Sequence, residues 1–221
     1  MKILAIADEE SKALWDYYDP EIIKGVDLIL SAGDLKAEYL EFLVTMTNLP
    51  LLYVRGNHDD FKERAPEGCI CIEDKLYNHN GLRIMGLGGS MYYHPGDNMY
   101  TEADMRRRVM RADMSAAIKG GCDILLTHSP ARGCGDLDDL PHRGFECFNT
   151  FLEHWKPKYM IHGHVHKAYG HFEQTRTHKC GTAVINACGY TIIDIPDTDY
   201  PEYGRTGSPL YDLYINMSWL H

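Results

Sequence analysis

Residues Met1–Glu10, MKILAIADEE, place an unbroken apolar run directly before three adjacent carboxylates. The run Ile3–Ala7 is short and ends in polar residues, and Val26–Ala32 and Leu51–Arg55 follow a similar pattern. Continuous apolar runs of this length predict strands that are buried on both faces of a sheet. We therefore expect a sheet that is covered on both sides.

The carboxylates of Asp8, Glu9 and Glu10 repel one another, and the next basic residue is Lys12. The cluster is either a solvated turn or a set of ligands for a cation. A solvated turn is the commoner case for a single acidic cluster. The polar residues that follow the other strands must decide between the two.

Segments with helical spacing alternate with the predicted strands. Lys36–Thr47 and Gly144–Trp155 predict helices, and Lys75–Met85 contains Asn80-Gly81, a strong signal for a hairpin turn. We expect an α/β fold with two facing mixed β-sheets flanked by helices, in a single domain over residues 1–221, with a surface loop at 200–209. Further strands are predicted at Asp123–Thr127, Tyr159–His162, Thr182–Ala187 and Thr191–Ile195.

The segment Thr101–Lys119 predicts a longer helix. It opens with Thr101-x-x-Asp104, close to the capping-box pattern of a helix N-terminus. The arginine run 106–108 is expected on the outer face. The residues expected on the apolar face are Met105, Val109, Met114 and Ile118.

Composition limits the classes of function. The chain has a net charge of −10, so the basic face that non-specific nucleic-acid binding needs is not expected. No apolar stretch is long enough for a membrane helix, and the N-terminus does not have the pattern of a secretory signal. Seven cysteines without framework spacing predict reduced, mostly buried thiols in a cytoplasmic protein.

Clusters of oxygen and imidazole donors stand at the ends of the predicted strands. In open α/β sheets, ligands bind outside the carboxyl ends of the strands. The clusters are therefore expected to meet at one edge of the fold. They are Asp8 and Glu10, Gly33-Asp34, Gly56-Asn57-His58-Asp59, Thr127-His128 and His162-Gly163-His164-Val165-His166.

Each cluster also has an ordinary structural explanation. Gly33-Asp34 can cap a helix, Gly56-Asn57 can form a tight turn, and His128 can simply end a strand. The three alternating histidines 162, 164 and 166 are harder to explain in this way. On an extended segment they would project to one side, where they gain little except as ligands or acid–base groups.

The ordered set Asp-x-Glu, Gly-Asp, Gly-Asn-His-Asp, Thr-His and Gly-His-x-His resembles the calcineurin-like metallophosphoesterase superfamily. The resemblance covers about Met1 to Ile195. The stretch THSPARGCGDLDDLPHRG, residues 127–144, is also similar to a segment of a bacterial branch related to small phosphodiesterases. This resemblance implies a four-layer sandwich of two sheets and their helices.

The resemblance also implies a centre of two divalent metal ions. Asp8 and His166 would bind the first ion, with Glu10 in the position usually occupied by histidine. An extended backbone would place the Asp8 and Glu10 carboxylates on one side and turn Glu9 toward solvent. Asp34 would bridge both ions.

The ligands implied for the second metal ion are Asn57, His128 and His164. His58 would stay unligated beside the leaving group, and His162 matches no ligand position. Two ions about 3.5–4 Å apart can share a hydroxide that attacks phosphorus. A protonated His58 would then act as general acid toward the departing alkoxide. The mixed oxygen and nitrogen ligands fit Mn, Fe, Co or Zn, and a third carboxylate favours Mn.

Contacts to the substrate are less well defined by the sequence. His94, Arg132 and His142 fall in segments that could cover the site, and packing of these loops explains them equally well. We expect a phosphodiesterase or phosphatase that acts on a small phosphorylated substrate, a phosphodiester or nucleotide. The alternatives are a non-catalytic interaction protein on this fold and, less favoured, a nuclease or protein phosphatase. The sequence does not determine the oligomeric state.

Overall fold

The computed structural model of the chain describes residues 1–59, 64–169 and 173–196. One sheet has the strand order β13-β1-β2-β3-β4. Strands β1, β2, β3 and β4 run parallel to one another, and β13 pairs with the other side of β1 in the antiparallel direction. The strands are β1 (Lys2–Ala7), β2 (Leu28–Ser31), β3 (Leu51–Tyr53), β4 (Ile70–Cys71) and β13 (Gly189–Asp194).

The second sheet has the order β11-β12-β10-β9-β6-β5. Its central pairs are parallel, and both edge pairs are antiparallel. Asn80 and Gly81 both have positive φ between β5 and β6, which confirms the predicted hairpin. The strands are β5 (Leu76–His79), β6 (Leu82–Leu87), β9 (Ile124–Thr127), β10 (Tyr159–His162), β11 (Thr175–Thr177) and β12 (Ala183–Asn186). A small separate pair joins β7 (Ser90–Met91) and β8 (Met99–Tyr100).

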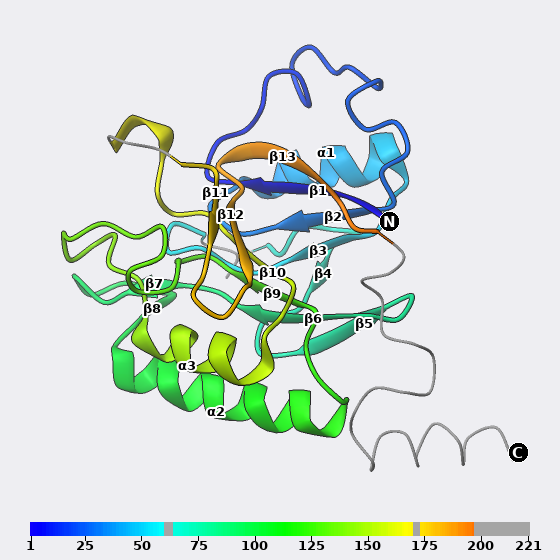
Figure 1. Cartoon of the computed structure of the whole chain (residues 1–221). Helices are drawn as coiled ribbons and strands as arrows, with labels where there is room; N and C mark the ends of the chain where they lie inside the picture. Colours follow the sequence, from blue (N-terminus) through cyan, green and yellow to red (C-terminus); the bar gives the residue numbers. More distant parts are fainter. Residues whose placement is uncertain (60–63, 170–172, 197–221) are drawn as a thin grey trace, which may run out of the picture.

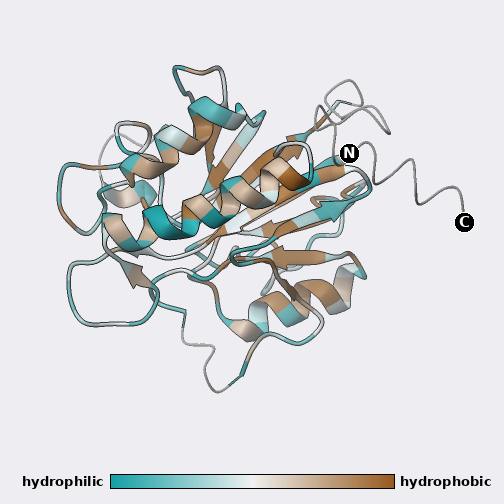
Figure 2. Ribbon diagram, turned by 90° about the horizontal axis from the view of Figure 1, so that it is seen from below, coloured by the Kyte–Doolittle hydropathy of each residue, from teal (hydrophilic) through white to brown (hydrophobic). Residues whose placement is uncertain are grey.

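The two sheets face each other between layers of helix, as predicted. Helix α1 (Ala37–Thr47) covers the first sheet, and α2 (Glu102–Ile118) and α3 (Glu146–Trp155) cover the second, as Figure 1 shows. Three apolar clusters fill the spaces between sheet and sheet, α1 and the first sheet, and α2 with α3 and the second sheet. In Figure 2 the strands behind the helices are mostly hydrophobic, whereas the helices also carry hydrophilic residues.

The part of the chain that the structure describes bears on the prediction about membrane helices and does not include the predicted loop at 200–209. Within residues 1–59, 64–169 and 173–196, no helix has the length and apolarity needed to cross a bilayer. A short 3₁₀ turn, η1 (Lys167–Tyr169), follows the last predicted histidine. The surface loop expected at 200–209 lies outside the described residues.

Helix α2 begins where its sequence predicts, since the Thr101 side chain accepts a hydrogen bond from the backbone N–H of Asp104 at 3.2 Å. Of the four residues predicted on its apolar face, two are buried and two are exposed. Met105 and Val109 are buried, but Met114 and Ile118 are 63% and 64% exposed. Met114 lies nine residues beyond Met105, which at about 100° per residue is the opposite side of the helix.

The prediction that all of residues 106–108 face outward is wrong for Arg108. Its guanidinium is buried, where it donates to Glu73 Oε1 at 2.9 Å, Asp74 Oδ1 at 2.8 Å and the Gly88 carbonyl at 2.7 Å. Glu73 also faces Arg55, with 3.6 Å between the charged atoms. Arg108 therefore supports the strand end that leads into the Gly-Asn-His-Asp segment.

Replacing Arg108 with Met should lower the free energy of unfolding by about 3–5 kcal/mol, because the buried Glu73 carboxylate loses its closest cation. Urea unfolding followed by circular dichroism measures the change. The matched control is Arg107→Met one residue earlier, where the side chain is 68% exposed and the expected change is within about 0.5 kcal/mol. Equal stabilities for the two variants would show that the Arg108 ion pairs do not stabilise the fold.

Candidate metal centre

The carboxyl ends of strands from both sheets bring the predicted ligands to one edge of the fold. The neighbouring strands β1, β2 and β3 run parallel in one sheet, and β9 and β10 run parallel in the other. A backbone hydrogen bond of 3.1 Å from Asp8 to Gly33 joins the first two strand ends, and one of 3.0 Å from Gly163 to His128 joins the last two. The residues that follow these strands are Asp8, Asp34, Asn57, His128 and His164.

Three of these side chains converge on the ring of His128, which is fully buried. Its Nε2 atom lies 3.0 Å from Asn57 Oδ1, 3.1 Å from His164 Nδ1 and 3.4 Å from Asp34 Oδ2. The ligand atoms of Asp34, His128 and His164 all lie within 4.8 Å of one another. The structure thus groups all the residues predicted for the second metal ion, together with the predicted bridging carboxylate.

The ring nitrogens of His128 and His164 that point away from the cluster make hydrogen bonds to backbone carbonyls, and these bonds fix which nitrogen of each ring faces the cluster. His128 Nδ1 lies 2.8 Å from the Ala32 carbonyl, and His164 Nε2 lies 2.7 Å from the Pro141 carbonyl. A carbonyl only accepts, so each of these nitrogens donates its N–H outward. The lone pairs of His128 Nε2 and His164 Nδ1 then face each other beside a carboxylate and an amide oxygen. With His128 neutral, four acceptors face one another, so either a proton on His128 Nε2 or a bound cation must lie between them.

Charge also shapes the cluster. Burial disfavours a protonated His128, but the neighbouring Asp34 carboxylate outweighs that effect and raises the pKa of His128 to about 9. Burial, together with repulsion from His128, lowers the pKa of His164 to about 3. The pKa of Asp34 is lowered: burial acts to raise it, but attraction and a hydrogen bond from His128 prevail. A proton on His128 would satisfy only part of the cluster, whereas a divalent ion can bind all four acceptors.

The backbone around the cluster adopts an uncommon conformation. Asp8, Asp34 and His164 have φ values of 63°, 57° and 70°, in the left-handed region that few residues other than glycine adopt. Such conformations cost on the order of 1–3 kcal/mol each and concentrate at functional sites. At Gly56, a Cβ atom would collide with the Asp34 carboxylate and the His128 ring. The fold therefore accepts strain to bring these groups together.

The Asp8 carboxylate lies beside the same cluster. Both of its oxygens accept from the backbone N–H of His164, at 2.9 and 3.0 Å. Burial raises the pKa of Asp8, and the charges of His128, Asp34 and His166 act on it as well. Asp8 is thus placed between the cluster around His128 and the region of His166.

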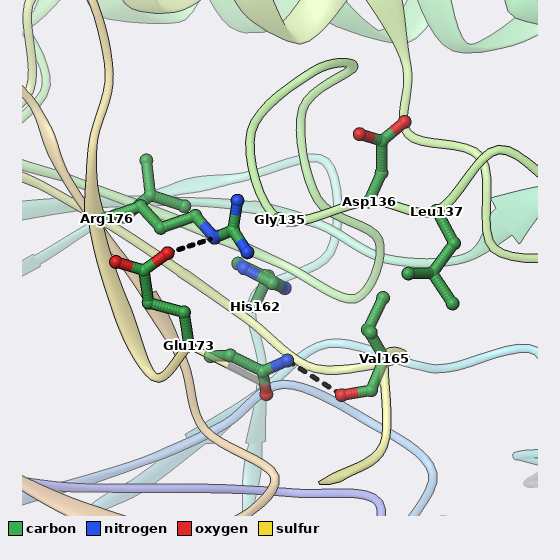
Figure 3. A pocket seen from close by; sticks show the side chains of 9 residues that line it. Gly135, Asp136, Leu137, His162, Val165, Glu173 and Arg176 are labelled. Carbon is green, nitrogen blue, oxygen red and sulfur yellow. Dashed lines mark hydrogen bonds and ion pairs between the residues drawn. The ribbon is translucent and has the colours of Figure 1, made fainter. Parts of the chain in front are cut away.

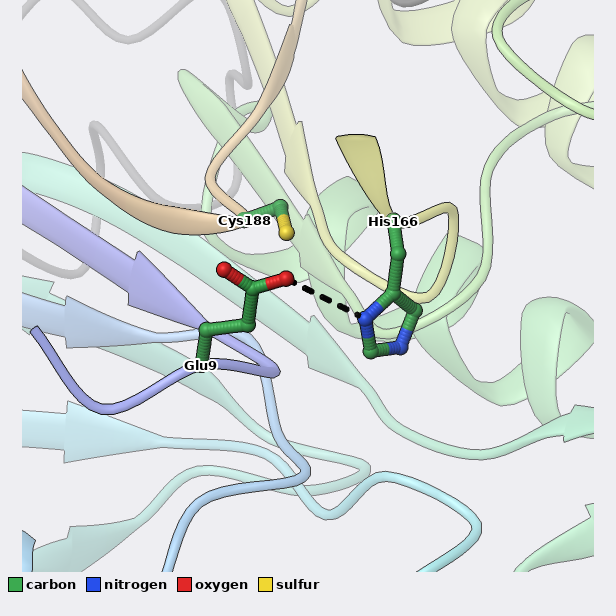
Figure 4. Close-up of side chains that lie close together, drawn as sticks. All are labelled: Glu9, His166 and Cys188. Carbon is green, nitrogen blue, oxygen red and sulfur yellow. Dashed lines mark ion pairs between the residues drawn. The ribbon is translucent and has the colours of Figure 1, made fainter. Parts of the chain in front are cut away.

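A second group of possible ligands contains Glu9, His166 and Cys188, drawn in Figure 4. Glu9 Oε1 lies 3.6 Å from His166 Nδ1. Glu10 instead lies 3.6 Å from the Lys36 ammonium. As predicted, the Glu9 side chain is the more exposed of the two, 53% against 27% for Glu10, yet Glu9 and not Glu10 is grouped with His166. Binding of the first ion by Glu10 stays a prediction. The positive φ of Asp8 ends the extended backbone on which the predicted alternation of Glu9 and Glu10 depended.

The three alternating histidines do not share one side, because the left-handed conformation of His164 also interrupts extension there. His164 joins Asp34 and His128, and His166 joins Glu9. His162 lies at the end of β10 in a separate small pocket, with Arg176 and Glu173 nearby (Figure 3). Burial lowers the pKa of His162 to about 4, so it is a neutral buried imidazole. His162 belongs to neither ligand group, in agreement with the sequence analysis, in which it matched no ligand position of the family.

Asp59 is a supporting residue to which sequence reasoning gave no role. Its Oδ2 atom accepts from the backbone N–H groups of Asp34 at 2.9 Å and Gly56 at 2.7 Å. Burial raises the pKa of Asp59 to about 6. The carboxylate thus ties the second and third strand ends together. Its position as the fourth residue of Gly-Asn-His-Asp was the only signal in the sequence.

The remaining predicted residues differ in their relation to the cluster. His58 is exposed, and its backbone N–H donates to Asp34 Oδ1 at 2.8 Å. The His142 ring packs against the His164 ring, with 5.3 Å between centroids. Arg132 pairs with Asp136 at 2.7 Å within its own loop. His94 is exposed, and its Nδ1 lies 2.9 Å from the Pro95 carbonyl. Of these four residues, His58 and His142 are the two that contact predicted ligands.

The two facing sheets and the acceptor cluster at their common edge define a metallophosphoesterase-like protein, and comparisons agree. The structure is similar to TT1561 of Thermus thermophilus, with a TM-score of 0.63 and 15% sequence identity over 87% of this chain and 93% of that one. At this identity the likeness shows the fold alone. A family model for calcineurin-like phosphoesterases matches residues 1–168, and the chain belongs to that family.

Two UPF0046 proteins of Caenorhabditis elegans are similar in sequence. One is 26% identical over 180 residues, which are 65% of this chain and 62% of that protein. The other is 42% identical over 103 residues, 46% of this chain and 25% of that protein. The chain thus spans less than two thirds of the length of these curated relatives.

Asp34→Asn should abolish the stabilisation that a metal ion gives, because a neutral amide replaces the carboxylate closest to His128. A ligand at about 100 times its dissociation constant stabilises the native state by about 2.7 kcal/mol. The measurement is the thermal midpoint of chelator-treated protein before and after addition of Mn²⁺ or Zn²⁺. Asp16→Asn, at an exposed position, is the control and should shift like the wild type. An unchanged shift in Asp34→Asn would exclude this carboxylate as a ligand.

Proposed function

We propose that the chain is a metal-dependent phosphoesterase that hydrolyses a small phosphodiester or nucleotide. The observation that carries the proposal is the convergence of the buried Asp34, Asn57 and His164 ligand atoms on His128 Nε2. Membership of the calcineurin-like phosphoesterase family supports the same conclusion. Divalent ions bound here would supply an activated water and neutralise charge on the phosphate.

The donor set fits such ions. Carboxylate and amide oxygens together with imidazole nitrogens suit first-row divalent metals, and Asp34, Asn57, His128 and His164 would hold one of them. The outward N–H bonds to the Ala32 and Pro141 carbonyls fix both rings for this task. In metal sites generally, a hydrogen bond from the ring nitrogen that does not bind the metal orients the histidine ligand. The charges of both His128 and His166 act on the Asp8 carboxylate, so Asp8 would bind a second ion next to the first.

His58 is suited to the role of general acid. Its side chain is exposed, so it can meet a substrate, and its backbone is tied to Asp34. It would hold a proton next to the departing oxygen and give it up as the ester bond breaks. Proton transfer of this kind contributes about 10²–10⁴-fold to rate.

The charge around the site favours substrates of low charge. Asp8, Glu9 and Asp34 place three carboxylates at one edge, and Asp59 lies directly behind. A phosphomonoester carries about −1.5 to −2 at neutral pH, whereas a diester carries a single negative charge. The carboxylates offset part of the attraction that bound divalent ions would exert, and this loss is larger for the more highly charged monoester. This is the reason for proposing a diester or nucleotide ahead of a simple monoester.

His142 and Tyr169 would contact the bound substrate. Their rings lie 4.6 Å apart between centroids, and Tyr169 also packs against His166 at 5.3 Å. They form an aromatic border between the residues of the two ligand groups. A flat nucleobase or aryl group could stack there. Arg132 is less suited to hold a phosphate, because Asp136 already neutralises it.

His58→Ala should keep its metal ions but lose about 10²–10⁴-fold in kcat on an alkyl phosphodiester, where the leaving group must be protonated. The loss should be much smaller for a nitrophenyl diester, whose leaving group departs without a proton. Release of product is measured with metal-loaded protein for both esters. His154→Ala, an exposed histidine on α3, is the control and should match the wild type.

Two results would contradict the proposal at different levels. Equal losses for the two esters would exclude His58 as the general acid. Failure of the metal-loaded wild type to hydrolyse any diester, monoester or nucleotide would contradict the phosphoesterase function itself and favour an interaction protein on this fold.

A further inference from the structure

We propose that Cys188 is a metal ligand, and that with Glu9 and His166 it forms a thiolate-containing half of the metal centre. The inference rests on the proposed function, since it assigns ligands to the second ion of that centre. Cys188 is completely buried, and its Sγ lies with Glu9 and His166 ligand atoms in a group whose members are all within 4.8 Å of one another. Figure 4 shows the three side chains pointing toward a common space.

The local backbone holds Cys188 in this position. Asn186, at the end of β12, accepts from the backbone N–H of Cys188 at 2.9 Å and donates from Nδ2 to the Val165 carbonyl at 2.8 Å. One side chain therefore fixes the cysteine and the residue directly before His166. Ala187 adds a backbone hydrogen bond of 2.7 Å to His162. The thiol and the imidazole are thus positioned by the same few contacts.

The spacing of the group matches the size of a metal site. With bond lengths of about 2.0–2.1 Å to nitrogen or oxygen and 2.3 Å to sulfur, two ligands of a tetrahedral ion lie about 3.4–3.6 Å apart. Glu9 Oε1 and His166 Nδ1 are 3.6 Å apart. The largest separation in the group, at most 4.8 Å, requires only a small approach of the side chains.

The surroundings of Cys188 do not suit the other roles of a cysteine. A nucleophilic or redox-active thiol needs access and positive neighbours. Cys188 has no exposed surface, and the charges of Asp8 and Glu9 act on its sulfur more strongly than the opposing charge of Lys167. Buried sulfur facing carboxylates and an imidazole is the environment of a ligand set.

This ligand set changes the expected metal. The preference for Mn²⁺ depended on Glu10 as a third carboxylate, and Glu10 pairs with Lys36 instead. Thiolate and imidazole favour softer ions such as Zn²⁺, Co²⁺ or Fe²⁺ over Mn²⁺. The site formed by Glu9, His166 and Cys188 should therefore bind Zn²⁺ or Co²⁺ in preference to Mn²⁺, while the oxygen-rich group around Asp34 accepts harder ions.

Cobalt substitution tests the inference on the whole chain. Co²⁺ bound to a thiolate gives a strong sulfur-to-cobalt absorption band in the near ultraviolet, whereas oxygen and nitrogen ligands give only weak visible bands. Titration of chelator-treated wild type with Co²⁺ should produce the ultraviolet band, and Cys188→Ser should lose it while keeping visible bands. Cys147→Ser is the matched control, because Cys147 is also buried and also faces a carboxylate, that of Glu102, and it should keep the band.

The outcomes separate this inference from the proposed function. A band that persists in Cys188→Ser, or wild type that binds Co²⁺ without the band, overturns thiolate ligation but leaves the metal centre in place. Wild type that binds no Co²⁺ at all overturns both. If Cys188→Ser does not fold, X-ray absorption of the zinc-loaded wild type decides: a sulfur neighbour at about 2.3 Å supports the inference, and a shell of nitrogen and oxygen alone overturns it.

Discussion

The hydrogen bond from His128 Nδ1 to the Ala32 carbonyl connects the two sheets at the edge where their strands end. His128 follows β9 in one sheet, and Ala32 follows β2 in the other. The same bond fixes a proton on Nδ1 and directs Nε2 toward Asp34, Asn57 and His164. The contact that joins the two sheets there is therefore also the contact that prepares the metal ligand. Loss of the ring would disturb both fold and site.

This arrangement has an energetic consequence. The cluster buries a carboxylate, an amide oxygen and two imidazole nitrogens that a single proton on His128 satisfies only in part, and three nearby residues hold left-handed backbone conformations. Without a positive charge these features oppose folding. The apolar clusters between the layers provide the opposing stabilisation, and a bound cation would convert the repulsive group into a stabilising one.

Much of this could be predicted from the sequence, because the apolar runs and the polar residues after them follow the rule that parallel strands end at one edge. The convergence of Asp34, Asn57, His128 and His164 depended on that rule alone. The sequence did not predict that Glu9 would lie beside His166, because the positive φ of Asp8 ends the extended backbone assumed there. The sequence did not single out Cys188, since His166 lies more than twenty residues before it and Glu9 nearly 180 residues before it. Only the path of β12 brings the three residues together.

The central claim is that the acceptors around His128 Nε2 bind a divalent cation. Anomalous diffraction from crystals grown with Mn²⁺ or Zn²⁺, collected at the absorption edge of the metal, tests it most directly. The account predicts an anomalous peak within bonding distance of Asp34, Asn57, His128 and His164. A map from metal-saturated crystals with no peak there, with His128 Nε2 protonated and bonded to Asp34 instead, would contradict it.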